Sequence, residues 1–116
     1  MSGLIWDGLT NLGNILTAGG VTWTADARAI RPNIAIIDPP SVRVINENIY
    51  ELTFGVYAVA APPADINSLK GMYKTADDII KAVPSTQNGA TPTVYVSGGQ
   101  ELPAMQVQTT ITVKRS

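Results

Sequence analysis

Two pairs of acidic residues are the best candidates for acid–base catalysis in this sequence, but the spacing of neither pair suits a shared catalytic site. Asp77 and Asp78 are adjacent in a segment with helical periodicity, and neighbours on a helix do not face one another. Glu47 and Glu51 flank an expected turn and the start of a strand, where acidic side chains are usually solvated. We therefore interpret all four as surface residues.

Nucleophilic and metal chemistry lack their usual residues. The chain contains no histidine and no cysteine, which removes the common base for a catalytic serine and the common zinc ligands. Gly98-Gly99 precedes no helix that could hold a phosphate, and Gly19-Gly20 follows a helix and suits its end. We predict no catalytic, cofactor-binding or metal-binding residue, and we expect that the protein is not an enzyme.

Composition favours one small domain that buries apolar surface. The 116 residues carry 8 basic and 9 acidic side chains, a net charge of −1, and no basic stripe of the kind that nucleic acids require. Charged residues make up 15% of the chain, against about 25% in an average soluble domain. This composition fits both burial against neighbouring subunits and an ordinary monomer. Because no signal peptide or apolar run of about 20 residues is evident, we expect synthesis in the cytoplasm and no membrane partner.

Two segments show the periodicity of amphipathic helices. The first carries an apolar stripe of Ile5, Leu9, Leu12 and Leu16. Ser2 is the expected N-cap and Gly19-Gly20 the expected stop, while Gly8 and Gly13 weaken the helix so that packing must stabilise it. The second, longer helix carries a stripe of Ile66, Leu69, Tyr73, Ala76, Ile80 and Val83. Asp65 or Asn67 is its expected cap, and Pro84 lies just beyond its end.

Short apolar segments between turn residues indicate strands. We expect them at residues 21–24, 33–37, 41–45, 50–61, 93–96 and 105–113, with residues 26–31 irregular or a further short strand. Asn88-Gly89 falls in an expected flexible connection, and residues 97–103 join the last two strands as a hairpin. This order predicts one α+β domain over residues 1–116, a mostly antiparallel sheet with one long helix packed across it and an N-terminal helix.

The strand at residues 50–61 is apolar on both faces toward its end, so its second face needs cover. Alternate residues of a strand point to opposite faces, which places Tyr57 and Val59 away from the face expected to carry the helix. Tyrosine is enriched at protein interfaces. We therefore interpret Tyr57, Val59 and Tyr95 as candidate subunit contacts, alongside the alternative that they pack in the core.

The order of these segments resembles a known family. Asp38-Pro-Pro-Ser-Val-Arg-Val44, the strand ending Val56-Tyr-Ala-Val-Ala-Ala-Pro-Pro63, the helix with Thr75-Ala-Asp-Asp-Ile-Ile-Lys81 and the closing segment 102–115 are similar to the tail terminator (tail-to-head joining, or neck) proteins of long-tailed bacteriophages, in particular those of actinobacteria. The resemblance covers nearly the whole chain. It rests on the order of the segments, the chain length and the general residue pattern, not on a diagnostic motif.

The resemblance implies a ring of six copies in the virion neck. Such a ring caps the tail tube, ends its polymerisation and contacts the head–tail connector, while genome DNA passes through the lumen without specific binding. A repeated contact in a closed ring needs two different patches on each subunit. We expect Tyr57 and Val59 in one patch, and either the N-terminal helix or a strand with Ile34 and Ile36 in the other.

Three other interpretations remain open. The first is another phage neck or head-completion protein, which the general residue pattern does not distinguish from a tail terminator. A monomeric α+β binding or adaptor domain would cover the second face of the long strand with its own N-terminal helix. A small enzyme with a serine–lysine pair is the third, although no SxxK pattern accompanies it.

Overall fold

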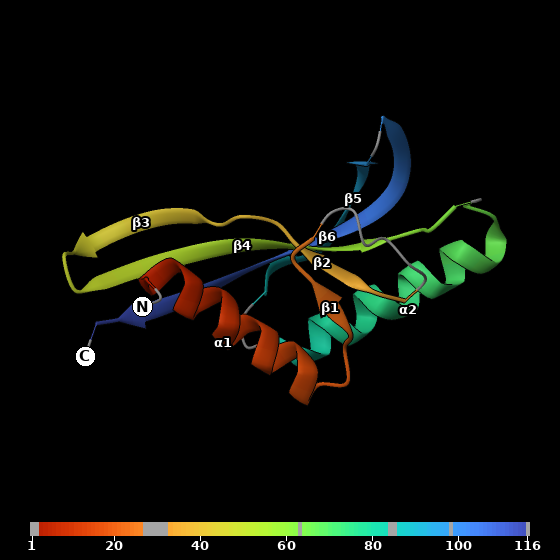
Figure 1. Cartoon of the computed structure of the whole chain (residues 1–116). Helices are drawn as coiled ribbons and strands as arrows, with labels where there is room; N and C mark the ends of the chain where they lie inside the picture. Colours follow the sequence, from red (N-terminus) through yellow and green to blue (C-terminus); the bar gives the residue numbers. More distant parts are fainter. Residues whose placement is uncertain (1–2, 27–32, 63, 84–85, 98, 116) are drawn as a thin grey trace.

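Two helices and one six-stranded sheet make up the fold of the residues that the structure describes (Figure 1). The computed structural model describes residues 3–26, 33–62, 64–83, 86–97 and 99–115. The elements in chain order are α1 (Leu4–Ala18), β1 (Trp23–Thr24), β2 (Ala35–Ile37), β3 (Ser41–Asn46), β4 (Ile49–Val59), α2 (Ile66–Ala82), β5 (Thr86–Ser97) and β6 (Gln100–Lys114). Among the described strands only β1 and β2 pair in parallel, so the prediction of an α+β fold with a mostly antiparallel sheet is confirmed.

Strand β4 is the centre of the sheet. It pairs with β6 along its whole length, from Ile49↔Lys114 to Val59↔Ala104. Its other edge is shared by β2 and β3, which follow one another along it. Pro39 and Pro40 separate β2 from β3 because proline cannot donate to a ladder. Toward its end β4 packs against the core under the helices on one face and against residues of β5 and β6 on the other, which explains why its sequence is apolar on both faces there.

Both helices pack on one face of the sheet, below it in Figure 1. Two glycines let α1 approach closely. A Cβ at Gly8 would meet the side chain of Leu52, and a Cβ at Gly13 would meet the indole ring of Trp23. The helix ends at Ala18 and is followed, as predicted, by Gly19 and Gly20, the latter with a φ of +81°.

The predicted helical stripes have the right period but are wrong at several positions. In α1 the buried residues are Leu4, Gly8, Leu12, Gly13 and Leu16, while Ile5 is exposed. In α2 they are Met72, Thr75, Ala76 and Ile79, while Ile66 and Tyr73 are exposed. The N-cap of α1 is Gly3 rather than Ser2. For α2 the cap is Asp65, whose carboxylate accepts a hydrogen bond from the Ser68 N–H at 3.0 Å.

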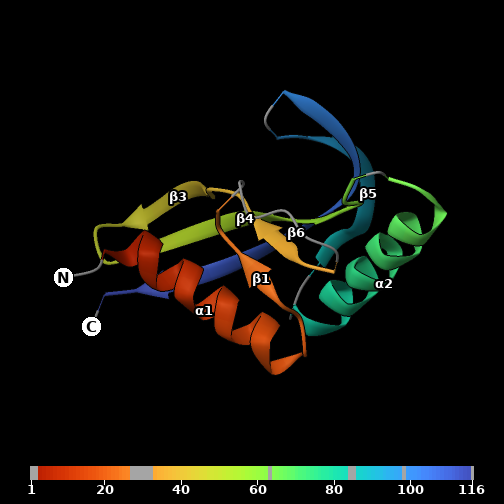
Figure 2. The same cartoon turned by 45° about the vertical axis from the view of Figure 1, so that its right-hand side comes forward.

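The β5–β6 hairpin is longer than predicted, and its tip curves away from the helices (Figure 2). Asn88 and Gly89, expected in a flexible connection, lie within β5, where the pairing with β6 shifts register between Thr86 and Ala90. A shift of this kind marks a bulge, and Gly89 has the φ of +62° that favours glycine. Of the expected structure at residues 26–31, all but Asp26 lies outside the described residues, as do Ser2 and Pro84.

Candidate functional site

A second apolar cluster lies on the face of the sheet opposite the helices. We call it the tyrosine cluster; its members are Ile36, Tyr57, Val59, Tyr95, Leu102 and Ala104. They come from β2, β4, β5 and β6, which meet here because the hairpin tip curves over the sheet. The rings of Tyr57 and Tyr95 lie edge to face, with centroids 5.2 Å apart, an arrangement that aromatic pairs favour.

Polar side chains tie this cluster together. The Tyr95 hydroxyl donates to Oδ1 of Asp38 at 3.4 Å, and Nε2 of Gln106 donates to the Tyr57 hydroxyl at 3.0 Å. Burial raises the pKa of Asp38, and the hydrogen bond from Tyr95 partly offsets this. Burial, and then the negative charge of Asp38, raise the pKa of Tyr95 to about 12. A phenol with that pKa stays protonated at neutral pH, so Tyr95 links the hairpin to β2 and is not a base or nucleophile there.

The structure brings four of the five predicted interface residues into contact, but inside one chain. Ile36, Val59 and Tyr95 are buried in the tyrosine cluster and Tyr57 is half-buried against it. Ile34 is also buried. Within the single chain the β5–β6 hairpin already covers the second face of β4, so a contact of these residues with a neighbouring subunit stays a prediction. Alternation along a strand carries no information on how a sheet curves, so the hairpin could not be predicted as the cover.

Exposed apolar side chains lie instead on two strand edges. On β3, Val42 and Val44 are 40% and 60% exposed. On β5, Val94 and Val96 are 54% and 62% exposed. We call these the β3 edge and the β5 edge. Sequence reasoning missed both pairs, although the pattern valine-x-valine is visible in each strand.

Neither edge has a strand partner on its outer side within the described part of the chain. The β3 strand pairs only with β4, and the β5 strand pairs only with β6. The two edges are well separated in both views of the molecule (Figures 1 and 2). Unpaired strand edges are places where another chain can add to a sheet.

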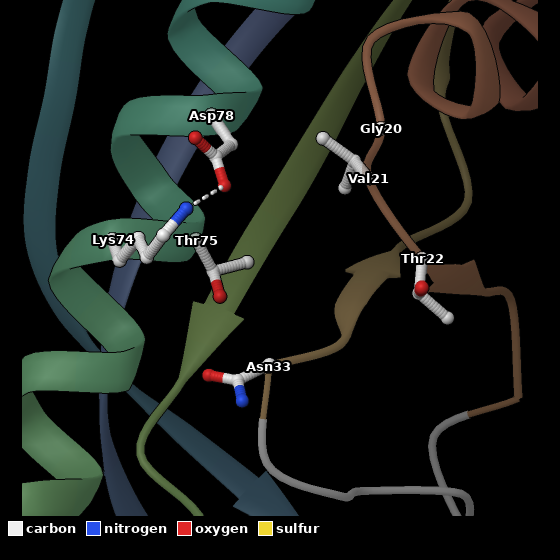
Figure 3. A pocket seen from close by; sticks show the side chains of 7 residues that line it. All are labelled: Gly20, Val21, Thr22, Asn33, Lys74, Thr75 and Asp78. Atoms are coloured by element: carbon white, nitrogen blue, oxygen red, sulfur yellow. Dashed lines mark hydrogen bonds and ion pairs between the residues drawn. The ribbon is translucent and has the colours of Figure 1, made fainter.

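A polar pocket of about 290 Å³ lies between the end of α1 and the middle of α2 (Figure 3). Gly20, Val21, Thr22, Asn33, Lys74, Thr75 and Asp78 line it. Its two charged groups neutralise one another, since Nζ of Lys74 lies 3.0 Å from Oδ2 of Asp78. The lining therefore offers neither a net charge for an ionic ligand nor a pair of groups poised for proton transfer.

An apolar groove of about 330 Å³ lies between α1 and the β2–β3 connection. Ile5, Trp6 and Leu9 form one wall, and Pro39 and Pro40 form the other. Ile5 and Trp6 are both exposed. The groove suits apolar contact with another macromolecule better than catalysis, because few polar groups converge on it.

The residues that the structure describes contain neither a cluster of potential metal ligands nor a helix able to cross a membrane. Within those ranges no three acidic side chains gather as a metal ion would require. Of the two helices described, neither is long and apolar enough to span a bilayer. Comparison of the sequence with protein-family models and with curated proteins gives no match.

Proposed function

We propose that this chain is a structural protein of a long-tailed bacteriophage, a tail terminator that forms a ring of six copies. The ring caps the tail tube, ends its polymerisation and joins the tail to the head connector. The protein has no catalytic role, is made in the host cytoplasm and resides in the virion neck, where genome DNA passes through the lumen without specific contacts. In this proposal α2 (Ile66–Ala82) is the long helix packed across the sheet.

The observation that carries the proposal is the pair of exposed apolar edges on one elongated chain. A ring needs two different contact surfaces on each subunit, whereas a monomer gains nothing from unprotected valine edges. The β3 edge and the β5 edge provide two such surfaces, and the molecule measures 46 × 28 × 23 Å along its principal axes. The low charge content of 15% also suits a protein that buries surface in an assembly.

The test combines mass in solution with tube capping. Light scattering over a concentration series is expected to show a species near six times 12.3 kDa. Added to growing tail tubes, the protein is expected to stop elongation and to appear as a ring at one tube end by electron microscopy. Tubes that grow to the same length with and without the protein would refute the tail-terminator function, and binding to filled heads alone would identify a head-completion protein.

The apolar groove between α1 and the β2–β3 connection favours a second candidate, a monomeric adaptor domain. An apolar side chain of another protein could enter between Trp6 and Pro40. The adaptor function requires a monomer at every concentration, so the light-scattering series separates it from the ring.

A further inference from the structure

We infer that copies of this chain join edge to edge, with the β3 edge of one copy pairing antiparallel with the β5 edge of the next. This inference rests on the proposed function only in that both require self-assembly. It specifies the contact, namely one continuous sheet running through neighbouring subunits.

Strand direction is the first argument. The β3 strand is antiparallel to β4, β4 to β6, and β6 to β5, so β3 and β5 run in opposite directions. A neighbour in the same orientation, as ring symmetry demands, therefore presents its β3 antiparallel to β5. Antiparallel pairing continues the pattern of the sheet without reversing any strand.

The facing of the side chains is the second argument. Val42 and Val44 pair with Leu52 and Tyr50, so they lie on the helix-covered face. Val94 and Val96 pair with Pro103 and Glu101 of β6. In β6, residues 101 and 103 alternate in phase with Val107, which belongs to the core under the helices. All four exposed valines thus lie on the same face of the sheet.

Register is the third argument. In an antiparallel pair the sum of opposing residue numbers is constant, and a single register places Val42 opposite Val96 and Val44 opposite Val94. The same register places Ser41 opposite Ser97, and Arg43 opposite Tyr95. Arg43 is the only charged residue in β3 or in residues 92–97 of β5, so no like charges meet. Cross-strand valine pairs on one face stabilise such a sheet.

The closing experiment uses introduced cysteines, which are unambiguous because the chain has none of its own. The variant Val42→Cys/Val96→Cys places two thiols on opposed residues, whose Cα separation of about 4.5–5.5 Å suits a disulfide. Mild oxidation is expected to give covalent dimers and higher multiples on a non-reducing gel. The matched control is Arg43→Cys/Val96→Cys, since Arg43 lies between the two valines on the same strand, pairs with Glu51 and so faces the other side of the sheet. Little cross-linking is expected from it.

Equal cross-linking in both variants, or none in either, would overturn the inference. A charge exchange gives an independent readout in solution. Val44→Lys is expected to weaken self-association by on the order of tenfold, and Val44→Lys/Val94→Glu to recover it, because the two charges meet across the same register. Failure of the double variant to recover association would also overturn the proposed register.

These tests are separable from the test of function. A ring whose Val42→Cys/Val96→Cys variant does not cross-link leaves tube capping possible and refutes edge pairing. Efficient cross-linking with no effect on tube growth supports edge pairing and refutes the tail-terminator function.

Discussion

Replacing Gly13 by alanine tests whether the close approach of α1 to β1 constrains the fold. Alanine is better than glycine in a helix interior by about 1 kcal/mol, so helix propensity alone predicts stabilisation. In this structure a Cβ at Gly13 would lie 2.6 Å from Cε2 and 2.8 Å from Cη2 of Trp23. The indole is also held in place, because its Nε1 donates to Oγ1 of Thr17 at 3.2 Å.

Overpacking a filled site costs about 1–3 kcal/mol, and a rigid ring places Gly13→Ala in the upper half of that range. Subtracting the gain in propensity leaves a net loss of about 1–2 kcal/mol, or a fall in melting temperature of about 5–10 °C for a chain of this size. Thermal unfolding followed by circular dichroism measures it. The matched control is Asn14→Ala, an exposed position in the same helix turn, where a small rise is expected.

A second variant separates the clash from any general damage to the helix. In a Trp23→Leu background the ring is gone, so Gly13→Ala is expected to be neutral or stabilising, with a clear coupling between the two sites. A Gly13→Ala protein that melts higher than the parent would refute the reasoning. An equal loss in both backgrounds would also refute it, because the ring of Trp23 would then not be the cause.

Three further predictions follow from single buried or capping groups. Thr109 is fully buried and its hydroxyl has no hydrogen-bond partner among the described residues, so Thr109→Val is expected to stabilise by about 1 kcal/mol; a lower urea midpoint would contradict this. Because the pKa of Asp38 is raised above 3.8 by burial, its contribution to stability is present in acid and is lost as pH rises through the folded-state pKa. The Asp38→Asn variant should therefore melt higher than the parent at neutral pH, with the gap closing toward acid; a gap that is independent of pH would be inconsistent with burial as the cause. The pKa of Asp65 is lowered from 3.8, mainly by its hydrogen bonds with Ser68, so Asp65→Ala should melt lower at neutral pH, with a gap that also closes in acid, while Asp65→Asn retains the cap; equal melting of both variants would argue against capping.

Helix period could be predicted from the sequence, but helix phase could not. The face of α2 that packs in the core carries Leu69, Met72, Ala76, Ile79 and Val83. These residues have the same spacing of three and four as the predicted stripe, so periodicity fits both sets equally well. Both stripes share three members, and only contact with the sheet decides between them. In α1, Gly8 and Gly13 lower the helix propensity, but they are also the positions where the helix approaches the sheet most closely.

The tyrosine cluster depends on the curvature of the β5–β6 hairpin, which the alternation of apolar and polar residues along a strand cannot reveal. The period-two pattern correctly separated Tyr57 and Val59 from the helix-covered face. It carried no information on the curvature of the β5–β6 hairpin, which brings Tyr95 over β4. The exposed valine pairs were accessible in principle, since valine-x-valine in two strands suggests edges, but the edge position of β3 follows only from the pairing of β4 with β6.

The central position of β6 has a consequence for the order of folding. This strand follows every other described element along the chain, yet it lies between β4 and β5 in the sheet. Its partner β4, paired with it from Ile49↔Lys114 onward, is therefore synthesised long before it. Pairings between residues so distant in sequence close slowly, because the entropy of the intervening loop is lost before the contacts form. During synthesis, β4 therefore has one unpaired edge, and its face opposite the helices stays uncovered, until β6 has been made. Nascent chains at that stage are the ones most prone to aggregate, and a slower rate of synthesis before β6 would lengthen their exposure.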